Sequence, residues 1–234
     1  MKNTYIFILA ILLFSSKTNA QELLGGQSFG SNTQGIISTT AVVLNENVDG
    51  TPYIDEKFAP AKISASENNI FYVRYNAAND EIEVKGSNNV AYALNKYRKD
   101  ITVDIIALKK TYQNFMYINS DDDPGFGYFV HISEPTANVK ILKKEVVKFF
   151  DEKVQVTGYD TPQNAKYKRL ADKYFIKIND KNAMLLPSNK KGVAKLFPEH
   201  EKEVLSYIKT EKIKFKDELS LSKLSAYLNQ LNQI

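Results

Sequence analysis

Apolar and polar positions alternate most regularly between residues 71 and 85. The apolar positions of this stretch are Phe71, Val73, Tyr75, Ile82 and Val84. Successive side chains of a β-strand point to opposite faces, so a period of two predicts two half-buried strands. Residues 77–80 separate the two runs and end in Asn79-Asp80, residue types that favour turns. The pattern therefore predicts a β-hairpin.

The same alternation predicts how the two strands pair. If Asn76 lies opposite Glu81, the apolar residues face one another on one side, and Arg74 lies opposite Glu83 on the other side. We expect the apolar side to face the core and the Arg74–Glu83 pair to face solvent. An exposed ion pair contributes only about 0.2–1 kcal/mol, so Arg74→Ala should have a mild effect. Val73→Asp should be severe, because it would place a charge in the core.

Short apolar runs with turn residues between them continue the β pattern as far as residue 187. They predict strands at residues 90–94, 102–108, 112–118, 128–133, 139–142, 146–150, 173–178 and 183–186. A further strand is expected at residues 39–44, and the polar stretch 158–171 is expected to be a loop with a helical turn. A spacing of roughly 10 residues between strands is typical of an antiparallel sheet or sandwich and not of βαβ units.

Beyond Pro187 the apolar spacing changes to three and four residues, which indicates helices. Ser188 is the expected cap of a first helix that ends before Pro198, and Pro198 is the expected start of a second helix. A third helix from about Asp217 carries four leucines, Leu221, Leu224, Leu228 and Leu231. An isolated helix of about 15 residues is marginally stable, so this leucine stripe needs a surface to cover it.

The predicted fold class is therefore α+β, with an antiparallel β-sheet or sandwich domain followed by a small C-terminal helical unit. The predicted boundaries are residues 51–187 for the β domain and residues 188–234 for helices that dock on it. Residues 21–50 hold five of the ten glycines among serine, threonine and asparagine. We expect this segment to be a flexible leader.

The first 20 residues have the three parts of a secretory signal peptide. Lys2 provides the positive start, residues 5–14 form an almost unbroken apolar run, and Thr18-Asn19-Ala20 offers a cleavage site. This run is too short to span a bilayer core of about 30 Å. We expect cleavage near Ala20 and a mature protein in the periplasm or outside the cell. Loss of Lys2 and Lys17 would reduce the formal charge from +4 to +2.

Composition narrows the possible chemistry. The 234-residue chain has no cysteine and two histidines, which excludes disulfides and thiolate metal sites and leaves little scope for a histidine metal site. The small net charge argues against nucleic-acid binding. We expect no cofactor and no metal, and we assign no residue a catalytic, cofactor-binding or metal-binding role.

The acidic segment from Asn119 to Gly125 is the closest approach to a metal-binding loop. Its alternating oxygen-bearing residues resemble the start of a calcium loop. However, its glycine is at the seventh position instead of the sixth, and Val130 occupies the twelfth position, where a calcium loop has a glutamate. A solvated hairpin loop is the favoured interpretation.

No pair of residues forms a convincing catalytic centre. His131 and Ser133 share one face of a predicted strand, but no sharp turn presents the serine as a nucleophile. We therefore expect a half-exposed surface histidine. His200 lacks the partner four residues away that a zinc helix has. Paired carboxylates such as Glu81 and Glu83 lie beside lysines or on an outward face, which is typical of a solvated surface.

Aromatic and basic residues are the remaining candidates for binding. The chain has 14 tyrosines and 13 phenylalanines, and many fall on predicted strands, where core packing accounts for them. The alternative is that some of them line a binding face for a peptide, glycan or lipid. Basic stretches at residues 96–99, 140–153 and 190–195 leave attraction to anionic polymers or lipid headgroups open.

Two segments, near the two ends of the mature chain, have a distinctive sequence. The first comprises Thr51-Pro52-Tyr53-Ile54-Asp55-Glu56-Lys57-Phe58 with residues 72–84, and the second comprises Leu186-Pro187-Ser188-Asn189-Lys190-Lys191 with Leu196-Phe197-Pro198. Together they resemble a family of exported proteins of Bacteroidota, over roughly residues 51–231. The resemblance implies export and a β domain with a helical tail. The family has no assigned activity, so the resemblance implies no catalytic residue.

These patterns favour a non-enzymatic interaction or ligand-binding module of the bacterial periplasm or cell exterior. Its expected partner is an envelope protein or polymer whose identity the sequence leaves open, as it does the oligomeric state. Nucleic acid and a membrane span are not expected. The alternative is a hydrolase that acts on envelope polymers through carboxylates, and a pocket holding two carboxylates about 5–10 Å apart would favour it.

Overall fold

The computed structural model describes residues 35–42, 48–66, 69–87, 89–119, 121–153 and 163–231. The predicted signal peptide and the leader as far as residue 34 lie outside these ranges. So do residues 43 and 44 of the strand expected at 39–44, and residues 158–162 of the expected polar loop.

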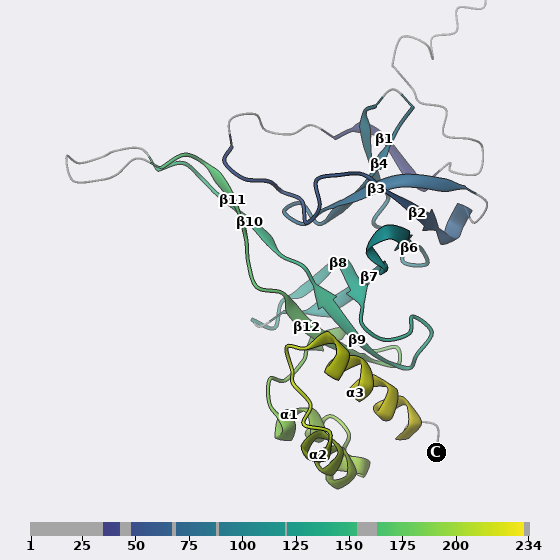
Figure 1. Ribbon diagram of the computed structural model, residues 1–234, viewed down its shortest axis with the longest axis vertical. Helices are drawn as coiled ribbons and strands as arrows, with labels where there is room; N and C mark the ends of the chain where they lie inside the picture. Colours follow the sequence, from purple (N-terminus) through teal and green to yellow (C-terminus); the bar gives the residue numbers. More distant parts are fainter. Residues whose placement is uncertain are drawn as a thin grey trace, which may run out of the picture.

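The elements follow one another as strands first and helices last (Figure 1). The strands are β1 (Ile37–Ala41), β2 (Ala59–Ile63), β3 (Ile70–Asn76), β4 (Glu81–Lys85), β5 (Ala91–Leu94), β6 (Thr102–Ile105), β7 (Lys110–Ile118), β8 (Pro124–His131), β9 (Val139–Lys144), β10 (Val147–Phe150), β11 (Lys166–Arg169), β12 (Lys173–Ile178) and β13 (Ala183–Leu185). The helices are α1 (Lys190–Lys195), α2 (Glu201–Thr210) and α3 (Glu218–Leu231), with short 3₁₀ turns at η3 (Ser64–Ser66), η4 (Ile106–Leu108) and η5 (Pro198–His200).

Strand β7 joins two parts of the β structure. Six strands, in the order β1-β5-β4-β3-β2-β6, form the N-terminal sheet, and β6 pairs with the first half of β7. The end of β7 pairs with β13 along the same edge, while β8 follows its opposite edge. Since β13, β12, β9 and β8 also pair in turn, these four strands and β7 form a closed ring. The pairing of β7 with β13 is parallel, whereas the other strand pairings described are antiparallel.

The expected β-rich region followed by a small helical unit is confirmed. The sandwich is not confirmed, because strand pairing closes the second group of strands into a ring. The polar stretch expected as a loop contains strand β11 instead, which β10 pairs with residue by residue. Strand β2 was not predicted either. Asn189, and not Ser188, caps α1, since its side chain accepts a hydrogen bond from the Gly192 amide at 2.8 Å.

The predicted hairpin register is confirmed by the pairing of Val73 with Val84 and of Arg74 with Glu83. The prediction that the charged side faces solvent is wrong, because Glu83 is completely buried. The guanidinium of Arg74 lies between two rings, 3.8 Å from the centroid of Tyr53 and 4.4 Å from that of Phe58. The segment that precedes β2 therefore covers this face of the sheet.

The described residues form three apolar cores. The first lies under the N-terminal sheet, and the second fills the closed ring with aromatic side chains. In the ring, Phe129 packs edge-on against Phe175 and Tyr117, with centroids 5.0 and 5.3 Å away. Edge-on packing is the favoured arrangement of aromatic pairs. The third core lies between the helices and the outer side of β9 and β12.

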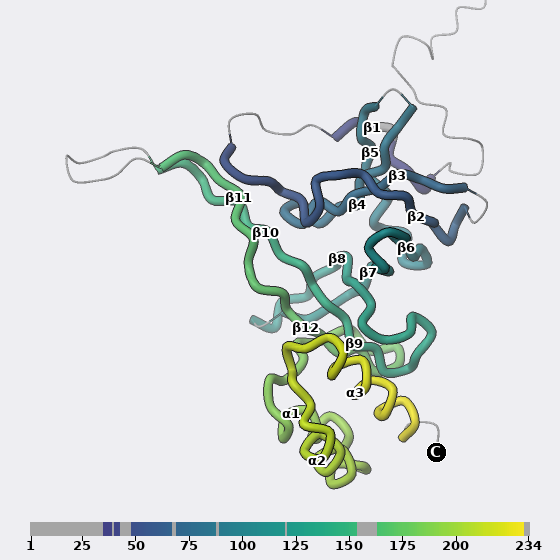
Figure 2. The backbone as a smooth tube through the Cα atoms, viewed as in Figure 1, coloured from purple at the N-terminus to yellow at the C-terminus, as the bar shows by residue number. Residues whose placement is uncertain are grey.

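Strands β10 and β11 form an arm that projects from the body (Figure 2). Around Lys166, at the outer end of the paired strands, the arm is joined to the segment before β2. The Asp49 amide donates a hydrogen bond to the Ala165 carbonyl at 2.9 Å, and the Asp49 carbonyl accepts one from the Tyr167 amide at 2.8 Å. In the part of the chain described, no helix has both the length and the apolar character needed to cross a membrane.

Candidate functional site

The buried carboxylate of Glu83 is fully engaged in structural contacts. Arg74 forms an ion pair with it at 2.8 Å, and Asn76 and the Tyr53 hydroxyl donate hydrogen bonds to it at about 3 Å. A buried charge needs this number of partners to offset its loss of hydration. Glu83 therefore anchors the segment before β2 and is not free to act as an acid or base.

Glu145 is the centre of a second buried network, between the arm and the ring. It accepts hydrogen bonds from the Tyr112 hydroxyl at 2.5 Å and from Lys110 at 2.9 Å, and Lys143 lies 3.6 Å away. Burial alone would raise the pKa of Glu145, but these hydrogen bonds and positive charges outweigh burial and lower it. A carboxylate held in its ionised form is unsuited to general-acid catalysis.

Asp80 links the β3–β4 turn to the ring. It pairs with Lys144 at 2.7 Å and accepts a hydrogen bond from the Tyr75 hydroxyl, also at 2.7 Å. Gly127 makes room for this pair, because a Cβ atom there would lie 1.9 Å from an Asp80 carboxylate oxygen. Burial lowers the pKa of Lys144, although Asp80 opposes this effect. The contact is a bridge between the two parts of the β structure.

The loop between β5 and β6 is held in place by side chains of β7. The side-chain amide of Asn114 donates a hydrogen bond to the Lys96 carbonyl at 2.5 Å, and the side-chain amide of Gln113 donates one to the Lys99 carbonyl at 3.3 Å. Asn114 is only 2% exposed, so its hydrogen bond is shielded from water. The loop backbone is thus fixed at two points.

This fixed loop presents an aromatic surface to solvent. Tyr97 is 78% exposed, and its ring stacks with that of Phe126 from β8, with centroids 6.3 Å apart and planes inclined by 11°. The Nζ atom of Lys99 lies 5.6 Å from the centroid of Phe126. We call Tyr97, Phe126 and Lys99 the aromatic platform. Sequence reasoning flagged the basic stretch 96–99 but missed the tyrosine within it.

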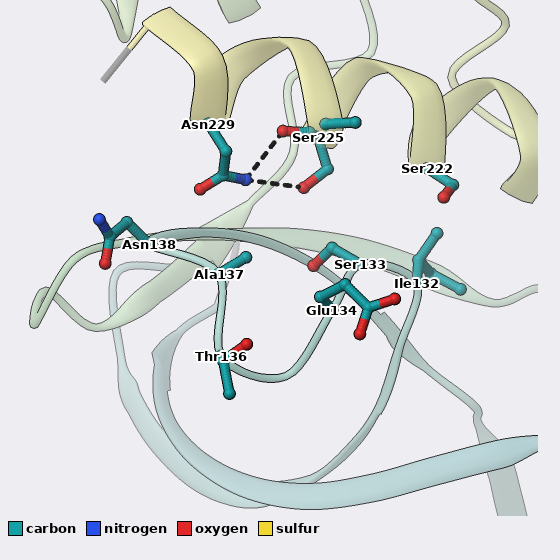
Figure 3. A pocket seen from close by; sticks show the side chains of 10 residues that line it. Ile132, Ser133, Glu134, Thr136, Ala137, Asn138, Ser222, Ser225 and Asn229 are labelled. Atoms are coloured by element: carbon teal, nitrogen blue, oxygen red, sulfur yellow. Dashed lines mark hydrogen bonds between the residues drawn. The ribbon is translucent and has the colours of Figure 1, made fainter. Parts of the chain in front are cut away.

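A polar pocket of about 430 Å³ lies between the β8–β9 turn and α3 (Figure 3). The Asn229 amide reaches across to β9, where its oxygen accepts a hydrogen bond from the Val139 amide and its nitrogen donates one to the Val139 carbonyl, both at 2.8 Å. Ser225 donates to the same carbonyl at 2.8 Å. These two side chains therefore fasten α3 to the sheet and leave little capacity for a ligand.

The remaining polar residues of the pocket form a shallow rim. Glu134, Thr136 and Asn138 are exposed on the turn, and Ser222 lies opposite them on α3 (Figure 3). Glu134 is the single carboxylate among the residues that line the pocket. The rim offers hydrogen bonds to a polar molecule, but it does not bring together a nucleophile and a base.

The acidic loop from Asn119 onward is organised by its own asparagine. The Asn119 side-chain oxygen accepts hydrogen bonds from the amides of Asp121 at 2.8 Å and Asp123 at 3.0 Å, which is the usual Asx geometry of a turn. Within the described ranges, no group of three histidine or acidic residues is placed to hold a metal ion. His200 lies 3.4 Å from Glu203, one turn along α2.

His131 is more enclosed than a surface histidine. Its Nε2 atom lies 2.9 Å from the Gln113 side-chain oxygen, and its ring packs edge-on against Phe115. Its Nδ1 atom is buried and has no hydrogen-bond partner in the part of the chain described. Burial, assisted by the positive charge of Lys140, lowers the pKa of His131 to about 4.

The lowered pKa of His131 should make stability depend on pH. An unfolded histidine has a pKa near 6.5, so between about pH 6.5 and 4 the unfolded chain binds more protons than the folded protein. The free energy of unfolding should therefore fall by about 2 kcal/mol from pH 7.5 to pH 5 because of this group. Urea denaturation should show that His131→Phe removes this loss and that His200→Gln retains it. An unchanged pH dependence in His131→Phe would contradict the assignment.

Comparison with known proteins does not assign a function to the aromatic platform or to the polar pocket. No protein family, curated protein or solved structure matches the chain. The candidate site therefore rests on its geometry and chemistry.

Proposed function

We propose that the chain is an exported, non-enzymatic binding module of the periplasm or cell exterior, and that it binds an acidic envelope glycan on the aromatic platform. The observation that carries this proposal is the exposed ring of Tyr97, stacked on Phe126 in a loop that Asn114 and Gln113 hold in place. A preorganised loop favours binding because less conformational entropy is lost when the ligand arrives.

The surroundings of the platform favour a sugar over an apolar peptide. A sugar ring has an apolar C–H face that packs on an aromatic ring, and its edge carries hydroxyls that stay in contact with polar groups. The residues next to Tyr97 are polar or charged, and Arg98 pairs with Asp100 at 2.7 Å in the same loop. Lys99, close to Phe126, offers a positive charge to a carboxylate on the sugar.

The alternative of a hydrolase acting on envelope polymers requires two carboxyl groups placed about 5–10 Å apart in a pocket. Of the residues lining the pocket in Figure 3, only Glu134 is acidic. Asp151 and Glu152 line a second groove, at the end of β10, but both are exposed to solvent, whereas a catalytic acid needs burial to raise its pKa. Glu83 and Glu145 are buried in networks with cations. Binding is therefore the function that the geometry supports best.

Affinity electrophoresis in gels that contain polygalacturonate, an acidic glycan, tests the proposal. Tyr97→Ala should weaken retardation by about tenfold in apparent affinity. This figure takes as its guide the stacking of a nucleic-acid base on an aromatic ring, which contributes about 1–3 kcal/mol. Tyr72→Ala is the matched control, because Tyr72 is 54% exposed on β3 and does not belong to the Tyr97 loop. It should bind as the wild type does.

Lys99→Gln tests the contribution of positive charge separately from that of aromatic stacking. It should weaken binding to polygalacturonate while leaving the weaker binding to a neutral dextran gel unchanged. If Tyr97→Ala and Tyr72→Ala bind equally well, the platform is not the glycan site. Release of new reducing ends from polygalacturonate by the purified protein would favour the hydrolase instead.

A further inference from the structure

One face of the arm carries positive charge around an exposed ring. Strand pairing places Lys148 opposite Lys168 and Phe150 opposite Lys166, and these four side chains share a face because they occupy alternating pairs of the ribbon. Phe150 is 37% exposed, and the Nζ atom of Lys148 lies 5.3 Å from its ring centroid. We call these four residues the arm face.

The arm face contains a local conflict. Like charges placed directly opposite each other across two strands are destabilising, yet Lys148 and Lys168 face each other in this way. Among the described residues, neither lysine lies within ion-pair distance of a carboxylate. Departures from local rules of this kind are found mainly at functional sites.

The opposite face of the arm is occupied, which leaves the arm face as the available one. Val147 is buried in the core of the N-terminal sheet, and Tyr167 packs against the same core. Phe149 in turn packs against Tyr167, with centroids 5.2 Å apart. On the arm face, by contrast, a groove of about 520 Å³ runs past Phe150, Lys166 and Lys168. The groove also includes Asp151 and Glu152, at the outer end of β10.

We propose that the arm face docks on an anionic lipid bilayer, with the lysines near the headgroups and the Phe150 ring at the interface. A membrane surface has an anionic headgroup layer above an apolar acyl-chain layer. The lysines can contact the first layer while the exposed aromatic side chain between them contacts the second. A soluble polyanion would satisfy the lysines but would leave the ring in water. The arm also projects from the body, away from the closed ring and the helices (Figure 1).

Vesicle sedimentation tests this proposal with a chain that begins at Gln21 and so keeps every described residue. Binding should occur to vesicles of equal parts phosphatidylglycerol and phosphatidylcholine, and should be lost with pure phosphatidylcholine or in 0.5 M salt. Lys148→Gln combined with Lys168→Gln should weaken binding by about 30-fold, since each lysine near an anionic surface contributes a factor of about 5.

Two further variants make the test specific. Lys191→Gln with Lys195→Gln removes the same charge from exposed positions of the first helix, and should bind as the wild type does. Phe150→Ser should weaken vesicle binding but leave binding to soluble polyphosphate unchanged. Equal losses in the two double variants would overturn the proposal, as would binding to polyphosphate without binding to vesicles. Tyr97→Ala should keep full vesicle binding, so this test is independent of the glycan site.

Discussion

Replacing Arg74 with alanine should reduce the free energy of unfolding by about 3–5 kcal/mol, and not mildly as an exposed ion pair would predict. Its partner Glu83 is completely buried, so the variant would leave a negative charge without its cation in the interior. Breaking one side of a buried ion pair is costly because the remaining charge has lost its hydration and gains nothing in return. The variant would also lose the packing of the guanidinium on Tyr53 and Phe58.

Urea denaturation of a small set of variants can isolate this effect. Arg98→Ala is the matched control, since Arg98 pairs with Asp100 on the surface and its loss should leave the unfolding midpoint unchanged. Combining Arg74→Met with Glu83→Leu should restore only part of the stability. It removes the unpaired charge, but it leaves the buried Asn76 side-chain amide and Tyr53 hydroxyl without their acceptor. If Arg74→Ala lowers the free energy of unfolding as little as Arg98→Ala does, Arg74 and Glu83 do not form a buried pair.

Leu224→Ala should destabilise the protein by about 2–5 kcal/mol, the usual range for removing a buried leucine side chain. Leu224 is completely buried between α3 and the outer side of the ring. Leu219 lies on the same helix but is 69% exposed, so Leu219→Ala should leave stability almost unchanged. The melting temperatures of the two variants isolate the effect of burial, because both variants replace a leucine of the same helix with alanine.

Truncation after Thr210 removes the whole of α3 and should have a larger effect. It would expose the outer side of β9 and β12 and leave the Val139 amide and carbonyl without Asn229. Exposed apolar surface of this extent causes association, so size-exclusion chromatography should show aggregates. A truncated chain that remains monomeric with an unchanged melting temperature would show that α3 is not needed for the fold.

Local patterns predicted the register of the β3–β4 hairpin but not its environment. Alternation and charge complementarity depend on the two strands themselves, so Val73, Arg74 and their partners could be placed from the sequence. Which side faces solvent depends on a segment that packs from outside. The rings of Tyr53 and Phe58 cover Arg74 from such a segment, and no periodicity links them to it.

The closure of the ring could not be predicted from the sequence either. Periodicity identifies strands but not their partners when they lie far apart in the chain, and β13 pairs with β7 across a long stretch of sequence. The short, basic strand β11 was missed because its pattern is weak and its pairing with β10 decides its conformation.

The sequence predicted only which residue types the candidate site would contain, and not which residues form it. The number of tyrosines indicated that some aromatic residues lie on the surface, and the basic stretch 96–99 was a separate candidate for binding anionic polymers or lipids. Tyr97 is singled out only when Asn114 and Gln113 are seen to hold its loop, because those contacts join β7 to a loop that precedes it. Calcium-loop spacing, by comparison, can be checked in the sequence itself, and the mismatches at Gly125 and Val130 were visible there.

The position of β7 has a thermodynamic consequence for the platform. One strand supplies hydrogen bonds to the N-terminal sheet and to the ring, and two of its side chains hold the Tyr97 loop. Local unfolding of the ring would therefore free β7 and release the loop as part of the same cooperative unit. Substitutions deep in the aromatic core of the ring, such as at Phe129, should alter the population of binding-competent molecules without touching the ligand.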